Sequence, residues 1–274
     1  MYKIIACDLD ETLLNDNAII CQRNKEAIQK AIEQGVKFVP ATGRGYRSTQ
    51  DILEELNLKD MAAEYVISFN GACLTENKDN TVLNFEGLTW ETAEKLFELG
   101  QKYDVCIHVY SPDVLYVYHV DEDELNYIRL RYNFKIIDDQ KNLEFLKGQK
   151  IPKVIYGSTD SEYLHQIAEE LGSITDDLDV SYSSNRYMEF NKKGINKGSG
   201  LKKLAQKLGV SMDETIALGD NFNDLSMIQA AGLGIGMNNT NPKMKQECDY
   251  ITEADNNQGG VAEAIEHFVL KSET

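Results

Sequence analysis

The chain has 274 residues, of which 42% are hydrophobic and 27% are charged, and its formal net charge is −17. This composition supports a sizeable hydrophobic core and is somewhat long for one compact domain. Such an acidic surface disfavours nucleic acid or an anionic membrane as a partner, and no apolar run approaches the ~20 residues of a membrane-spanning helix.

Cysteine and histidine usage indicates neither a disulfide framework nor a zinc site. The five cysteines are scattered without a CxxC pair, which is typical of reduced thiols. The four histidines form no HxxxH or HExxH pattern. The start "MYKIIACDLD" lacks the basic and apolar regions of a secretory signal. We therefore expect a cytoplasmic protein.

Short apolar strands alternate with single helices in the first 83 residues. The patterns predict strands over 3–7, 36–44 and 64–72, and helices over 24–35 and 49–58. Strands that alternate with helices form βαβ units, so we expect an α/β fold with a parallel sheet.

From residue 84 the pattern changes to closely spaced, tyrosine-rich strands mixed with helices. We expect residues 84–189 to form a separate α+β domain inserted into the first. The alternating pattern then resumes over 190–274, so residues 1–83 and 190–274 together are predicted to form the core domain.

The first predicted strand ends at two carboxylates. Asp8 and Asp10 are two residues apart in an extended segment, so their side chains can point to the same side. Two carboxylates this close need a cation or a shared proton, and Mg²⁺ prefers oxygen ligands. A calcium-binding EF-hand is excluded, because Leu13 and Ile19 stand where it needs Gly and Glu. An Asp-rich capping turn stays open as the alternative for this stretch alone.

Two further polar stretches follow a strand or open a helix. After the second strand, Thr42 and Gly43 can bind a phosphate oxygen, and the alternative is a glycine turn with Arg44 on the surface. Lys197 opens a helix, where the helix dipole disfavours a cation, so we expect an anion nearby. The alternative for Lys197 is a solvated lysine.

The last polar stretch is "LGDNFNDLSM". Asp220 and Asp224 are four residues apart across a strand-to-helix loop, so both can face one point. Asn221 and Asn223 add neutral oxygens and N–H donors. Helix capping explains one of the acids, but it does not explain the whole cluster.

The order DLDETL, ATGR, NKG and GDNFND resembles the motifs of the haloacid dehalogenase superfamily of phosphohydrolases. It is similar in particular to the Cof-type branch, subclass IIB, whose large cap lies between the second and third motifs. Residues 249–265 resemble the C-terminal stretch of that branch. The resemblance implies a Rossmann-like parallel-sheet core with an inserted α+β cap that sets substrate specificity.

The same resemblance implies a Mg²⁺-dependent phosphatase that cleaves phosphate monoesters of small metabolites, in particular sugar phosphates, through an aspartyl-phosphate. Asp8 would be the nucleophile, and Asp10 would be the general acid and then the general base. The implied magnesium ligands and their supports are Asp8, the Asp10 backbone carbonyl, Asp220, Asp224 and Asn221. The implied phosphate-binding residues are Leu9, Thr42, Gly43, Lys197 and Asn223. Candidates for substrate specificity are Arg44, Tyr46, Arg47, Asn70 and Arg186.

Asp10 also discriminates among related activities. Ion-pumping relatives carry Thr there, so Asp10 favours rapid hydrolysis. A phosphomutase, which shares Asp10, stays open, although its usual cap resembles a helical bundle. A catalytically idle, phosphometabolite-binding regulator on the same fold is the other alternative. Glu11 is expected to point away from the site as a solvent-exposed or capping acid, and the sequence does not specify the oligomeric state.

Overall fold

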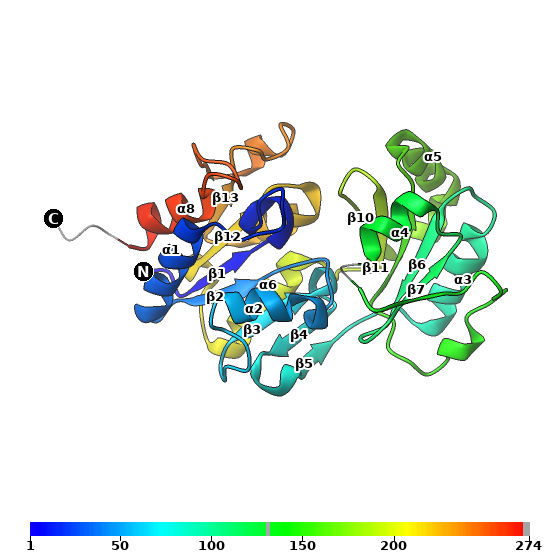
Figure 1. The fold of residues 1–274 in the computed structure, drawn as a ribbon, viewed down its shortest axis with the longest axis horizontal. Helices are drawn as coiled ribbons and strands as arrows, with labels where there is room; N and C mark the ends of the chain where they lie inside the picture. Colours follow the sequence, from blue (N-terminus) through cyan, green and yellow to red (C-terminus); the bar gives the residue numbers. More distant parts are fainter. Residues whose placement is uncertain (130–131, 271–274) are drawn as a thin grey trace. The chain divides into compact units, whose positions relative to one another are not determined.

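The computed structural model describes residues 1–129 and 132–270, which form two compact units. The first unit combines Met1–Asn84 with the chain from Asn196 onward, and the second is Phe85–Ile195 (Figure 1). Residues 190–195, which we assign to the core from the sequence, lie in the second unit, because β11 (Tyr187–Lys192) pairs along its length within the sheet of that unit. Within the described ranges, no helix has both the length and the hydrophobicity that a bilayer crossing requires.

The first unit is built on a parallel sheet with the strand order β14-β13-β12-β1-β2. Its strands are β1 (Ile4–Cys7), β2 (Lys37–Pro40), β12 (Thr215–Gly219), β13 (Leu233–Gly236) and β14 (Tyr250–Ile251). Every residue of β1 and β12 is buried, which explains their continuous apolar sequence. The α/β class predicted from the sequence is confirmed.

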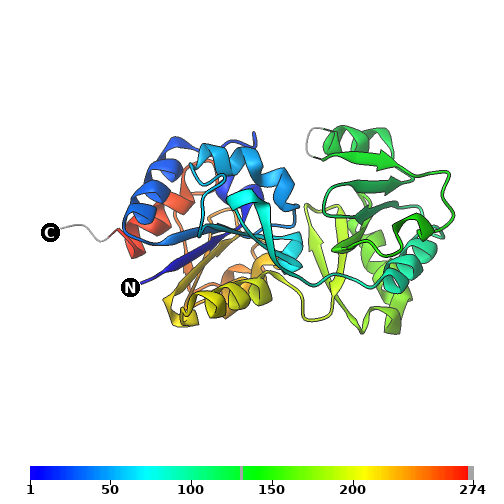
Figure 2. The same ribbon diagram turned by 90° about the horizontal axis from the view of Figure 1, so that it is seen from below.

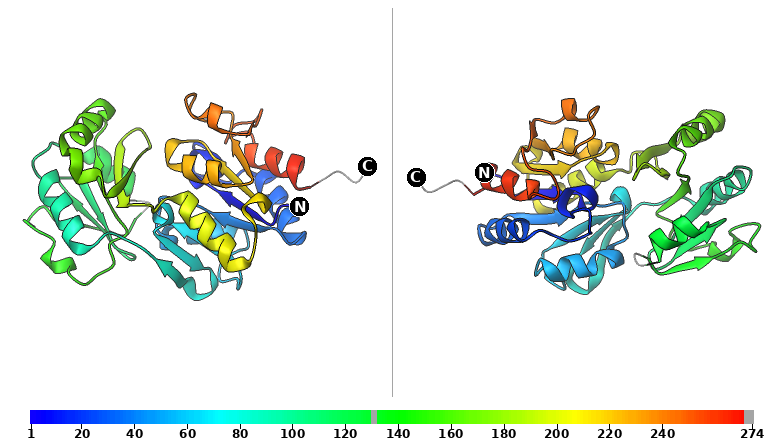
Figure 3. Two further views of the ribbon diagram at one scale, coloured as in Figure 1. Left: turned by 180° about the vertical axis from the view of Figure 1, so that it is seen from behind. Right: turned by 45° about the horizontal axis from the view of Figure 1, so that its top comes forward.

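Helices cover both faces of this sheet. They are α1 (Gln22–Glu33), α2 (Gln50–Glu55), α6 (Lys197–Leu208), α7 (Leu225–Ala230) and α8 (Gly260–Phe268). Helices α1 and α8 pack side by side on one face, and α6 lies on the other (Figures 2 and 3). The first and last helices of the chain therefore meet in one layer.

Helix α6 approaches α7 very closely at its first turn. A Cβ atom on Gly198 would lie 2.2 Å from the carbonyl oxygen of Ser226, so only glycine fits there. The backbone N–H of Gly198 also donates to Oγ of Ser226 at 3.0 Å. These contacts fix the start of α6, which carries Lys197.

A small second sheet extends the first unit. It has the order β3-β4-β5, with β3 (Tyr65–Ser68), β4 (Cys73–Glu76) and β5 (Thr81–Phe85). Ala41 forms a parallel bridge to Ile67, so the loop after β2 lies beside β3. We did not predict β4 and β5 from the sequence, because polar residues interrupt their apolar pattern and much of β5 is exposed.

The second unit is a mixed sheet with the order β10-β11-β9-β6-β7-β8. Its other strands are β6 (Cys106–Tyr110), β7 (Leu115–Tyr118), β8 (Phe134–Ile136), β9 (Lys153–Gly157) and β10 (Leu178–Ser183). Its helices are α3 (Trp90–Gly100), α4 (Glu122–Ile128) and α5 (Ser161–Leu171). This unit is the α+β segment that the sequence predicts.

The two faces of this mixed sheet differ in polarity. Met188 and Phe190 of β11 enter an apolar core. Because side chains alternate along a strand, Glu189 points to the opposite face, where it forms a buried ion pair with Lys153.

Candidate active site

The first loop of the site begins where β1 ends. The N–H of Asp8 donates to the carbonyl oxygen of Leu218 on β12 at 2.9 Å. The chain then makes a wide turn over Leu9–Leu13, in which exposed Glu11 has a φ of 60°. The turn leaves Asp8 only 6% exposed at the carboxyl end of the sheet, where ligands bind in folds of this kind.

Asp8 lies in a buried group of carboxylates with Asp220 and Asp224. One carboxylate oxygen from each residue lies within 4.8 Å of the others. Asp220 follows β12, and Asp224 lies in the turn before α7. Like charges this close require a positive partner. Oxygen ligands of this kind fit a hard divalent cation such as Mg²⁺.

Lys197 supplies part of that positive charge. It is the first residue of α6 and is fully buried. Its Nζ donates to Oδ1 of Asp8 and to Oδ1 of Asp224, both at 2.5 Å. Burial alone would lower the pKa of Lys197, but the two carboxylates raise it above its ordinary value. Lys197 therefore stays charged, yet one ammonium group does not balance three carboxylates.

The uncompensated negative charge alters the acidity of the carboxylates. Burial, followed by Asp224, raises the pKa of Asp8 to about 7, with Lys197 acting in the opposite direction. Burial, then Asp224 and Asp8, also raise the pKa of Asp220 well above its ordinary value. A cation bound among these oxygens would favour the ionised forms.

Thr12 and Asn241 position Asp220. The fully buried Thr12 donates from Oγ1 to Oδ1 of Asp220 at 2.7 Å, and the N–H of Asn241 donates to the Asp220 carbonyl oxygen at 2.9 Å. We assigned neither residue a role from the sequence. Thr12 follows Asp8 by four residues within the same motif, which was a usable signal. Asn241 lies in the loop after β13, where the sequence pattern gave no comparable signal.

Asp10 is not part of the carboxylate group that Asp8, Asp220 and Asp224 form in the described residues. Arg44 donates to Oδ2 of Asp10 from Nε at 2.9 Å and to Oδ1 from Nη2. This two-bond fork fixes the direction of a carboxylate. The Asp10 side chain is 46% exposed and the Arg44 side chain 12%. The structure thus places Arg44, a specificity candidate from the sequence, against the proposed proton donor.

The loop after β2 carries Thr42 and Gly43. Thr42 is 1% exposed, and its N–H donates to the carbonyl oxygen of Ile67 at 2.9 Å. Its Oγ1 accepts the N–H of Arg44 at 3.1 Å, which leaves the hydroxyl proton able to donate to a ligand oxygen. Gly43 follows and is half-buried.

The loop after β12 is shaped by Asp224 and Asn221. Oδ2 of Asp224 accepts the backbone N–H groups of Asp220 at 3.1 Å and of Asn221 at 3.2 Å. Oδ1 of Asn221 accepts the N–H of Phe222 at 2.9 Å. Asn223 is half-buried in the same turn. Asp224 is therefore both a cap for its own loop and a member of the carboxylate group.

Three specificity candidates lie in the loops after β2 and β3. Tyr46 packs edge-on against Phe69 with ring centroids 6.5 Å apart, and the guanidinium of Arg47 lies 5.6 Å from the Tyr46 ring centre. The N–H of Asn70 donates to the carbonyl oxygen of Thr42 at 3.0 Å, so the two loops support one another.

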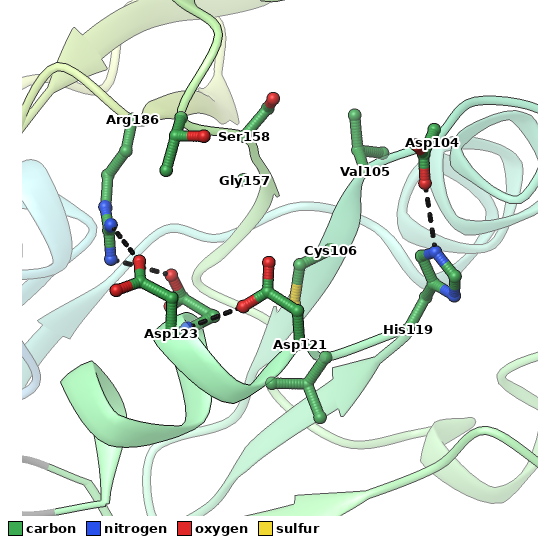
Figure 4. Close-up of a pocket in the computed structure, with 12 residues that line it drawn as sticks. Asp104, Val105, Cys106, His119, Asp121, Asp123, Gly157, Ser158 and Arg186 are labelled. Atoms are coloured by element: carbon green, nitrogen blue, oxygen red, sulfur yellow. Dashed lines mark hydrogen bonds and ion pairs between the residues drawn. The ribbon is translucent and has the colours of Figure 1, made fainter.

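Arg186 belongs to the second unit, where it lines a cavity of about 290 Å³ (Figure 4). Its guanidinium donates to Asp123 at 2.5 Å and to Glu124 at 3.2 Å. Because these two carboxylates already neutralise it, Arg186 has little capacity left to attract a phosphate in this arrangement.

A family model described as haloacid dehalogenase-like hydrolase matches residues 5–265. The chain belongs to this family and is an enzyme of the hydrolase class. A Bacillus subtilis (strain 168) protein named 5-amino-6-(5-phospho-D-ribitylamino)uracil phosphatase YcsE is 31% identical, over 98% of this chain and 96% of its own. The resemblance stated from the sequence motifs is confirmed.

Solved structures support the same assignment. A haloacid dehalogenase-like hydrolase from Bacteroides thetaiotaomicron has a TM-score of 0.83 at 28% identity, covering 97% of this chain and 99% of that chain. A structure described as a subclass IIB sugar phosphatase has a TM-score of 0.83 at 23% identity, covering 97% of this chain and 98% of that chain. The second likeness establishes a shared fold.

Proposed function

We propose that this protein is a Mg²⁺-dependent phosphatase that hydrolyses phosphate monoesters of small cytoplasmic metabolites, with sugar phosphates as the expected class. The observation that carries the proposal is the contact of Lys197 with Asp8 inside a buried group of carboxylates. Membership of a hydrolase family and similarity to a named phosphatase support it.

Asp8 is the proposed nucleophile. One of its carboxylate oxygens attacks phosphorus, the bond from phosphorus to the substrate oxygen breaks, and that oxygen takes a proton from the Asp10 carboxyl group. Water then attacks the phosphorus of the aspartyl-phosphate and gives a proton to Asp10. Inorganic phosphate leaves, and Asp8 returns as a carboxylate.

The carboxylate group would hold the metal. The proposed ligands and supports are Asp8, Asp220, Asp224, the Asp10 backbone carbonyl and Asn221. When bound, Mg²⁺ would neutralise charge on the phosphoryl oxygens and favour the ionised form of the nucleophile. The donors are all oxygens, which is the ligand type that this ion prefers.

The phosphoryl oxygens need donors around them. An ammonium group has three protons, and Lys197 gives two of its hydrogen bonds to carboxylates, so one remains for a phosphoryl oxygen. The Thr42 hydroxyl is the second donor that the geometry supports. The further proposed donors are the backbone N–H groups of Leu9 and Gly43 and the side chain of Asn223.

Substrate choice is proposed to depend on the second unit, with the first contributing from its loops. Tyr46, Arg47 and Asn70 are the candidates from the first unit. Arg186 of the second unit is the weaker candidate, because Asp123 and Glu124 already engage its guanidinium. Arg44 is better explained as a partner of Asp10, because its guanidinium is already engaged there.

Phosphate release from p-nitrophenyl phosphate and a panel of phosphorylated metabolites tests the proposal. Wild-type protein with Mg²⁺ should turn over, whereas wild-type protein in EDTA and Asp8→Asn with Mg²⁺ should not. Equal release under all three conditions would refute the mechanism. Tight phosphate-ester binding without turnover would indicate a regulator, and isomerised product without free phosphate would indicate a phosphomutase.

A further inference from the structure

The turn that carries Asp10 is held by a residue distant in the sequence. Asn256, in the loop before α8, is 2% exposed. Its Nδ2 donates to the carbonyl oxygen of Leu14 and to Oδ1 of Asp16, both at 3.1 Å. Leu14 closes the turn, because its N–H donates back to the carbonyl oxygen of Leu9 at 2.8 Å. Asn256 therefore fixes the closing end of the turn.

Two other asparagines hold carbonyl groups of the same turn. Nδ2 of Asn239 donates to the carbonyl oxygen of Glu11 at 2.7 Å, and its Oδ1 accepts the N–H of Asn256 at 3.1 Å. Nδ2 of the fully buried Asn24 donates to the carbonyl oxygen of Leu13 at 3.5 Å, while its Oδ1 accepts a backbone N–H from α8. These asparagines come from three separate segments of the chain, so the turn depends on tertiary contacts.

The turn needs this support because of its backbone conformation. Glu11, directly after Asp10, has a φ of 60°, in the left-handed region that residues with a Cβ rarely adopt. Such a conformation persists only where its surroundings determine it. Arg44 fixes the carboxylate of Asp10, whereas the asparagines fix the backbone that carries it.

We propose that Asn256 is a positioning residue for Asp10. Together with Asn239 and Asn24, it keeps the Asp10 carboxyl group where it can give its proton to the leaving oxygen. This inference rests on the proposed phosphatase function. Proton transfer requires donor and acceptor within hydrogen-bond reach. A relaxed turn should therefore impair proton transfer more than it impairs Asp8, which β12 holds before the turn begins.

The dependence of rate on the leaving group isolates this role. p-Nitrophenolate leaves readily without a proton, whereas phenolate, from the similarly shaped phenyl phosphate, depends more on acid assistance. Asn256→Ala should lower kcat/KM for phenyl phosphate about fivefold more than kcat/KM for p-nitrophenyl phosphate. Asp10→Asn should change the ratio of kcat/KM for phenyl phosphate to kcat/KM for p-nitrophenyl phosphate in the same direction and by a larger factor.

A matched control comes from another buried asparagine in the first unit. Asn77 is 1% exposed and donates from Nδ2 to the carbonyl oxygen of Leu58 at 2.9 Å. Asn77→Ala should lower the melting temperature about as much as Asn256→Ala does. It should leave the ratio of the kcat/KM values for the two esters unchanged.

Asn239→Ala gives a second test, at an exposed position. It should shift the ester ratio in the same direction as Asn256→Ala, by a smaller factor. Unchanged ratios in both variants, with the wild type active, would overturn the positioning role alone. A wild-type protein that hydrolyses neither ester with Mg²⁺ would overturn the proposed function.

Discussion

Replacing Lys197 with methionine should destabilise the metal-free protein through charge rather than through packing. Methionine is unbranched and adaptable, so it fits the space that the lysine stem occupies. The change removes the ammonium that binds Asp8 and Asp224 at 2.5 Å. Removing one partner of a buried ion pair costs about 3–5 kcal/mol, because the remaining charge stays buried. At about 2–4 °C per kcal/mol, the melting temperature of the first unit should fall by roughly 6–20 °C.

A double-mutant cycle separates charge from packing. Asp8→Asn alone should stabilise the protein in EDTA, because burial and Asp224 disfavour the Asp8 carboxylate. In the Lys197→Met background, Asp8→Asn should stabilise the protein by about 1–3 kcal/mol more than it does in the wild-type background. The assay is urea denaturation of the four proteins in EDTA at about pH 8. If Asp8→Asn changes the free energy of unfolding equally in both backgrounds, Lys197 acts through packing and the electrostatic reasoning is refuted.

Three further predictions concern the same cluster. Metal-free stability should fall as pH rises from about 4 to about 7, because the folded-state pKa of Asp8, about 7, lies above its ordinary value of 3.8. The folded form then binds the proton more tightly than the unfolded form does. If the free energy of unfolding, measured by urea denaturation in EDTA, does not change over this pH range, the prediction is contradicted. Mg²⁺ should raise the melting temperature more at about pH 8 than at about pH 5.5, and Asp220→Asn should remove most of that rise. Thr12→Val should weaken Mg²⁺ binding about tenfold with the fold intact, as read from the Mg²⁺ dependence of the melting temperature, whereas Thr12→Ser should retain binding.

Sequence reasoning could anticipate which loops meet. The carboxyl ends of parallel strands lie along one edge of a sheet, so polar residues that follow different strands are brought together there. Asp8 and Lys197 are 189 positions apart in the chain, yet their side chains are in contact. The fold class follows from the same alternation of apolar strands and helices, because that alternation requires a covered parallel sheet.

Other features depended on contacts that a single sequence does not encode locally. Strands β4 and β5 have mixed polarity, so their hairpin is determined by pairing with β3 rather than by periodicity. The fork between Arg44 and Asp10 joins two loops, and its geometry depends on the path of each. Asn256 appears in the sequence as one polar residue in a loop, and only tertiary structure brings it to Leu14.

Asp8 and Asp10 are the same residue type two positions apart, so their different proposed roles must come from their surroundings. Asp8 is buried beside Lys197 and two other carboxylates, a place where a bound cation would keep it ionised for attack. Asp10 is half-exposed and bound by Arg44, and its carboxylate is outside the metal-ligand group found in the described residues. A proton carrier has to stay off the metal, because a coordinated carboxylate would not take up the proton that the leaving oxygen needs. The separation of the Asp10 carboxylate from the cation site is what distinguishes the two aspartates. The asparagines that hold the turn therefore help to maintain this separation.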